Sequence, residues 1–111
     1  MNRWKIPAWL EAEVRARDVR CVYCGVVFTS PTAGTRRTVA TWEHIVNDAR
    51  IVTAANIARC CGSCNASKGT KDLRAWLSSP YCHKRGITED TVAGVVRRAI
   101  LTPPELVPPG A

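Results

Sequence analysis

Two Cys-x-x-Cys pairs constrain this chain more than any other feature of its sequence. The pairs are Cys21–Cys24 and Cys61–Cys64, and 36 residues lie between them. Each pair can place two thiolates on one metal ion, and four thiolates make the closed tetrahedral site typical of structural zinc. Redox-active pairs and disulfides are the alternatives, but the segment Met1–Pro7 lacks the apolar stretch of an export signal, which disfavours disulfides. The spacing therefore predicts a zinc site with a large insertion between its halves.

The two remaining cysteines, Cys60 and Cys82, are predicted to pack as small apolar residues. Cys60 could replace Cys61 in the metal site only by breaking the two-residue spacing of the second pair. The predicted zinc ligands are therefore Cys21, Cys24, Cys61 and Cys64.

Length and charge indicate a small basic domain. The chain has 111 residues and a net charge of +7, and twelve of its sixteen cationic side chains are Arg. Arginine suits bidentate contact with phosphate, so we expect a polyanionic partner. No apolar run approaches the roughly 18 residues needed to span a bilayer, so no membrane association is expected. We predict one cytoplasmic domain over residues 1–102 and a Pro-rich flexible tail over residues 103–111.

Hydrophobic periodicity and turn residues predict a mixed α+β order of elements. The predicted strands cover residues 25–28, 36–46 and 56–60, and the first two predicted helices cover residues 7–18 and 63–69. Thr70 and Thr88 are the predicted caps of two further helices, and Pro80 is predicted to end the first of these. Three tryptophans on apolar stripes are predicted core residues: Trp9, Trp42 and Trp76.

Three short motifs accompany the cysteine pairs. They are Trp42-Glu43-His44-Ile45-Val46, Ala55-Asn56-Ile57-Ala58-Arg59 and, directly after Cys64, Asn65-Ala66-Ser67-Lys68-Gly69. Together and in this order, the motifs and the cysteine pairs resemble the HNH endonuclease family over about residues 19–72. The three positions that name the family would be His44, Asn56 and Asn65, an HNN variant. The resemblance implies a treble-clef-like ββα-metal core that zinc holds together, with helices from both termini covering it.

The residue chemistry of this segment suits hydrolysis of a phosphodiester bond. His44, with a reference pKa near 6.5, is a candidate general base at pH 7. Glu43 and Asn65 offer the hard oxygen ligands that Mg²⁺ or Mn²⁺ prefers. The family resemblance makes Asn56 the residue that steadies the loop holding His44. Lys68, on the same helix face as Asn65, is a candidate phosphate contact.

Two features of the segment leave alternatives open. Arg36 and Arg37, on a predicted hairpin, could contact DNA phosphates or simply be solvated. Glu43 and His44 are neighbours, and neighbouring residues of a strand face opposite ways. They can converge on one phosphate only if the strand ends there, as the resemblance implies.

The function predicted from these residues is a metal-dependent DNA endonuclease that cuts one strand at a time. It would contact DNA mainly through phosphates and act as a monomer or homodimer, alone or within a larger complex. The alternatives are a zinc-stabilised DNA-binding module without catalysis, and a phage-packaging or assembly accessory protein that uses the fold as a scaffold. The presence of Glu43, His44 and Asn65 favours the enzyme, because neither alternative needs a base beside an oxygen-ligand metal site.

Overall fold

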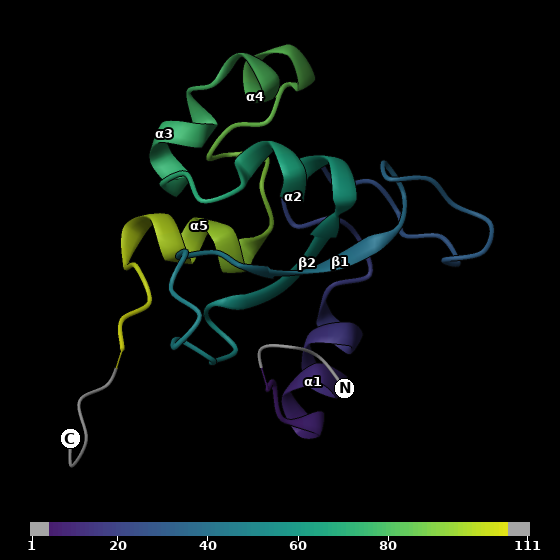
Figure 1. Cartoon of the computed structure of the whole chain (residues 1–111). Coiled ribbons are helices and arrows are strands. Elements are labelled where there is room, and N and C mark those ends of the chain that lie inside the picture. The colour runs from purple at the N-terminus through teal and green to yellow at the C-terminus, as the bar shows by residue number, and fades with distance from the viewer. Residues whose placement is uncertain (1–4, 107–111) are drawn as a thin grey trace.

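The computed structural model describes residues 5–106 of the chain (Figure 1). In this part of the chain a two-stranded antiparallel sheet lies between the first helix and the remaining helices. In chain order the elements are α1 (Ala8–Arg17), β1 (Ala40–His44), β2 (Ile57–Cys61), α2 (Gly62–Lys68), α3 (Leu73–Leu77), α4 (Pro80–Arg85) and α5 (Gly94–Leu101). The predicted small α+β fold is confirmed at this level.

The register of the sheet decides which side chains of the central motif share a face. In the antiparallel pairing of β1 with β2, Trp42 lies opposite Arg59 and His44 lies opposite Ile57. Because successive residues of a strand point to opposite faces, Trp42 and His44 share one face, and Glu43 lies on the other.

The two faces of the sheet pack against different helices (Figure 1). On one face, α1 and the sheet share a small buried cluster, with Trp42 packed against it: Ile6, Leu10, Val14 and Ile57. On the other face lies the larger core, which includes residues from the sheet region and from α3 to α5: Ile45, Ala58, Cys60, Leu73, Trp76, Val95, Val96 and Ile100. Each fully buried side chain of this size contributes about 1.5–3 kcal/mol, so burial on both faces holds the short strands together.

Helix α1 is confirmed where the periodicity predicts it, but one predicted core residue is wrong. Leu10 and Val14 are completely buried, whereas Trp9 is 67% exposed. Leu10 and Val14 are four residues apart and share one helix face, while Trp9 is rotated about 100° from its neighbour Leu10. The buried stripe of α1 is too narrow to include Trp9. Trp76 is buried as predicted, and Trp42 is half-buried.

The strand predicted over residues 36–46 is shorter than expected, because residues 36–38 form a turn and the strand begins at Ala40. The Thr38 and Val39 N–H groups both donate to the Thr35 carbonyl (2.9 Å each). Hydroxyl side chains in this stretch also bond locally, which competes with strand pairing. The strand predicted over residues 25–28 forms only an isolated bridge between Arg20 and Val27.

Helix α2 agrees closely with the prediction, and it ends at Gly69, which has a positive φ of 52°. Helix α4 was not predicted. Pro80 is its first residue, and the Ser79 side chain accepts a hydrogen bond from the Cys82 N–H (3.4 Å). Proline suits this position, because the first N–H groups of a helix have no partner within the helix.

The predicted caps of the last two helices are also corrected. Asp72, rather than Thr70, caps α3 and accepts a hydrogen bond from the Ala75 N–H (3.2 Å). Helix α5 begins at Gly94, six residues after the predicted cap Thr88. The Thr88 N–H instead donates to the Thr91 hydroxyl (2.8 Å), so this stretch is a turn that precedes the helix.

None of the helices in the described part of the chain is long and apolar enough to cross a bilayer. Residues 103–106 contain no helix or strand, and the rest of the predicted tail, residues 107–111, lies outside the described residues.

Candidate metal centre and strand-end site

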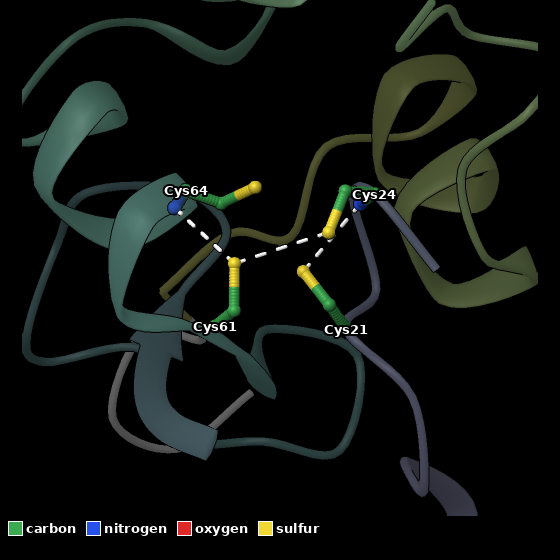
Figure 2. Close-up of side chains that lie close together, drawn as sticks. All are labelled: Cys21, Cys24, Cys61 and Cys64. Atoms are coloured by element: carbon green, nitrogen blue, oxygen red, sulfur yellow. Dashed lines mark hydrogen bonds between the residues drawn. The ribbon is translucent and has the colours of Figure 1, made fainter. Parts of the chain in front are cut away.

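The four cysteines of the two pairs come together as the spacing predicts (Figure 2). Their sulfur atoms all lie within 4.8 Å of one another, and the Sγ atoms of Cys24 and Cys61 are 3.9 Å apart. Four sulfurs at about 2.3 Å from a central zinc ion lie about 3.8 Å from one another. The cluster therefore has the donor set and spacing to hold a metal ion such as zinc.

Main-chain geometry orients the sulfur atoms of both pairs in the same way. The Cys24 N–H donates to Cys21 Sγ, and the Cys64 N–H donates to Cys61 Sγ, both at 3.4 Å (Figure 2). The first pair lies in a tight loop where Gly25 has a φ of 78°, and the second pair lies at the junction of β2 and α2. N–H groups directed at sulfur favour the thiolate, the form that binds a metal.

The thiols of the cluster are shifted toward ionisation by one another. Hydrogen bonding with Cys24 lowers the pKa of Cys21 to about 7, and hydrogen bonding with Cys21 lowers the pKa of Cys61 to about 6. Cys64 is the exception, because hydrogen bonding with Cys21 and with the other two thiols raises its pKa. The Tyr81 hydroxyl donates to Cys64 Sγ (3.4 Å) and supports this sulfur from α4.

The other two cysteines are core residues, as predicted. Cys60 and Cys82 are completely buried, and burial raises the pKa of both thiols. Cys60 faces Thr41 across the sheet and takes no part in the cluster of four sulfurs.

Glu43 is a buried carboxylate with two partners. The Tyr23 hydroxyl donates to Glu43 Oε2 (2.7 Å), and Lys68 Nζ lies 3.2 Å from the same oxygen. Exposed fractions are 6% for Glu43 and 1% for each partner. Burial raises the pKa of Glu43, although the charge of Lys68 and the Tyr23 hydrogen bond act against this rise.

The burial of Lys68 corrects the prediction that it contacts a DNA phosphate. Its ammonium group points into the protein, where it pairs with Glu43 and donates to the His44 carbonyl (3.4 Å). Lys68 lies in the last turn of α2, so this contact ties the helix to the end of β1. A buried cation of this kind requires a partner, because its desolvation is costly.

His44 is the last residue of β1 and is buried. Its neighbours Glu43 and Ile45 both face the larger core, so strand alternation places His44 on the α1 face. The strand ends at His44, which is the condition for His44 and Glu43 to converge on one phosphate. The side chains nevertheless continue to alternate between the two faces as far as Ile45. The two side chains therefore lie on opposite sides of the strand end. Burial lowers the pKa of His44, Lys68 lowers it further, and Asp48 opposes both.

Asn65 lies in the first turn of α2 and bonds directly to β1. Its Nδ2 donates to the Thr41 hydroxyl (2.8 Å) and to the Trp42 carbonyl (3.1 Å). The structure thus brings Asn65 next to the strand segment that precedes Glu43.

Asn56 is completely buried and holds the loop that follows His44. Its Oδ1 accepts from the Val46 N–H (2.7 Å), and its Nδ2 donates to the Val46 and Ile51 carbonyls (3.1 Å each). These bonds tie Asn56 to both ends of the loop that follows β1.

Arg36 and Arg37 are exposed in a turn rather than on a strand. The Arg36 carbonyl accepts from the Ser63 N–H (3.0 Å), which places this turn beside the start of α2. Sequence reasoning did not identify Tyr23 as a partner of Glu43. The two residues are 20 positions apart, and no local pattern links a tyrosine inside a cysteine pair to a distant carboxylate.

Comparisons with known protein families, with curated proteins and with solved structures find no match to this chain.

Proposed function

We propose that the protein is a metal-dependent DNA endonuclease of the HNH type, built on a treble-clef-like ββα-metal core. The observation that carries this proposal is the contact of Asn65 with the main chain of Trp42, one residue before Glu43. Helix α2 follows β2 directly, and in this proposal Asn65 and Glu43 would act together as metal ligands near the end of β1. Asn56 fixes the chain that leaves this end of the strand after His44.

In this proposal the four-cysteine centre holds structural zinc. It would join the loop of the first pair to the junction of β2 and α2, where the candidate site is built. Because the sheet has only two short strands, zinc would supply a large part of the folding free energy.

Each residue at the strand end has a role in phosphodiester hydrolysis. A phosphate bound across the end of β1 would meet His44 on one side and the ligands Glu43 and Asn65 on the other. His44, kept neutral by its lowered pKa, would accept the proton of the attacking water. In this proposal Glu43 Oε1 and Asn65 Oδ1 are the oxygens that would hold Mg²⁺ or Mn²⁺. The ion, when bound, would offset the charge that develops on the phosphate oxygens.

The Glu43–Lys68 pair favours a second candidate function, a zinc-stabilised DNA-binding or assembly module without catalysis. An ammonium group 3.2 Å from the carboxylate already balances the charge that would attract a divalent ion. In such a module the Glu43–Lys68 pair would only stabilise the fold. The two candidates differ in whether the protein cuts DNA.

The test is nicking of supercoiled plasmid with Mg²⁺ or Mn²⁺ by the wild-type protein and by His44→Ala. We expect His44→Ala to lower the rate by roughly two to four powers of ten. His83→Ala is the matched control, because the chain has two histidines and His83 is exposed on α4. Zinc content and thermal unfolding of each variant check that the fold is intact.

The wild-type rate should rise with pH through the lowered pKa of His44 and then level off, since only the neutral imidazole accepts a proton. Equal rates for His44→Ala and the wild-type protein would show that the nicking comes from another site or a contaminant. The binding module would then be the better assignment.

A further inference from the structure

Two arginines share one aromatic ring on the α1 face of the sheet. The Arg15 guanidinium, from α1, lies 5.1 Å from the centre of the Trp42 ring, and the Arg59 guanidinium, from β2, lies 5.4 Å from it. Arg59 also lies 5.5 Å from the Phe28 ring. Stacking on aromatic faces restricts the guanidinium groups and leaves their donor edges in defined positions.

The carboxylate of Asp18 acts on the charge of this cluster, and its Oδ2 accepts from the Arg59 main-chain N–H (3.1 Å). Asp18 is buried, however, and pairs through both oxygens with Arg17, at 2.7 and 2.8 Å. None of the ion pairs within residues 5–106 involves Arg15 or Arg59. The buried Nε of Arg59 also has no hydrogen-bond partner among the described residues. An anion beside the pair would meet two guanidinium groups that form no ion pair within residues 5–106.

The register of the sheet places this cluster beside the candidate base. Trp42 and His44 share one face of β1, and they are about 7 Å apart along the strand. Arg59 is the cross-strand partner of Trp42, and Ile57 is the cross-strand partner of His44. The Trp42–Arg59 pair, on which both guanidinium groups lie, is therefore two residue pairs from the His44–Ile57 pair, on the same face of the sheet.

We infer that Arg15 and Arg59, held against the Trp42 ring, form a binding site for a backbone phosphate of DNA next to His44. The choice of a DNA phosphate as the ligand rests on the proposed function, in which His44, on this face, is the base that acts on a phosphodiester. The arginine fork matches two phosphate oxygens, and such contacts fix the position of a duplex without reading its sequence. This site takes the role that the sequence suggested for Lys68, which is buried.

The test measures binding of a labelled duplex of mixed sequence by anisotropy, in buffer without Mg²⁺ or Mn²⁺ and at several NaCl concentrations. The variants are Arg15→Gln, Arg59→Gln and both together. The control is Arg85→Gln, which removes the same charge from a guanidinium that lies 4.4 Å from the Tyr81 ring on α4. Zinc content and unfolding temperature check the fold of each variant.

Each phosphate that the protein neutralises contributes about 0.9 to the slope of log affinity against log salt, so the double variant, which loses the one phosphate site, should lose about 0.9 of the wild-type slope. Arg85→Gln should keep the wild-type slope. A double variant with the slope and affinity of Arg85→Gln would overturn the inference. If Arg59→Gln does not fold, the exposed Arg15 decides the question: a slope and affinity below those of Arg85→Gln support the site, and values equal to those of Arg85→Gln reject it.

Plasmid nicking, measured separately, distinguishes this inference from the proposed function. A wild-type protein that binds through the arginine pair but never nicks would keep the phosphate site and refute the nuclease. If the double variant nicks plasmid with the KM of the wild-type protein, the phosphate site is refuted and the proposed nuclease function stands.

Discussion

Replacing Lys68 by Met should destabilise the protein strongly, because it removes the charge that balances a buried carboxylate. Lys68 Nζ lies 3.2 Å from Glu43 Oε2, and exposed fractions are 1% and 6% for the two residues. Breaking one side of such a pair costs about 3–5 kcal/mol. A domain of this size has a total stability of about 5–15 kcal/mol, so the loss is a large share of it. The Tyr23 hydrogen bond to Glu43 remains and should keep the loss near the lower value.

The loss should depend on pH in a defined direction. Burial raises the pKa of Glu43 above its ordinary value of 4.5, so the folded state binds this proton more tightly than the unfolded chain. This group therefore costs stability as pH rises from about 4.5 through the raised pKa. Lys68 lowers that pKa, and without it the pKa rises further. The effect of Lys68→Met should be smallest below pH 4.5 and should grow as pH rises.

Urea unfolding followed by circular dichroism, at several pH values, measures these differences. Lys71→Met is the matched control: Lys71 is exposed, and its change should stay within about 0.5 kcal/mol. Adding Glu43→Gln to Lys68→Met should recover at least about 2 kcal/mol near pH 7, because no buried charge is then left unpaired. A loss below about 1 kcal/mol at pH 7, without pH dependence, would refute the buried ion pair as described.

Three other changes test the metal centre, the loop and the surface. Cys64→Ser should abolish binding of one zinc ion per chain and largely unfold the domain, whereas Cys60→Ala should keep full zinc content by elemental analysis. Asn56→Ala removes three hydrogen bonds worth about 1 kcal/mol each, so urea unfolding should show a loss of about 3 kcal/mol. Trp9→Ala should change stability by no more than about 0.5 kcal/mol, since this side chain is 67% exposed.

The features that the sequence predicts well are those that a short local pattern determines. The two cysteine pairs predict the four-sulfur cluster, because a two-residue spacing brings two thiolates onto one ion. The end of α2 at Gly69 follows from the left-handed backbone that glycine permits. Pro80 is predicted to end a helix and instead begins one, because proline both stops helices and starts them. Here the Ser79 side chain caps the N-terminus of α4, so Pro80 begins a helix.

The contacts within the candidate site could not be predicted, because they join distant parts of the chain. Tyr23, Glu43 and Lys68 come from a loop, a strand and a helix, and the packing of all three elements brings them together. The same holds for Trp9, whose exposure depends on how much of α1 the sheet covers. The motifs are enough to identify the positions that the family resemblance names. They do not show how the side chains of this segment are divided between the two faces of the sheet.

Asn56 also determines where the hairpin between β1 and β2 can tolerate extra residues. The Ile45 N–H donates to the Asn56 carbonyl (2.9 Å), and the Asn56 amide group holds both main-chain groups of Val46. A slip of β1 by one residue would exchange the faces of Glu43 and His44, so the carboxylate would lose Tyr23 and Lys68. An insertion within residues 47–50 falls between Val46 and Ile51, the two points that the Asn56 amide holds, and even doubling a loop's length costs only about 0.6 kcal/mol. We therefore expect the hairpin loop to accept added residues, whereas an added residue between His44 and Val46 would misalign the strand end.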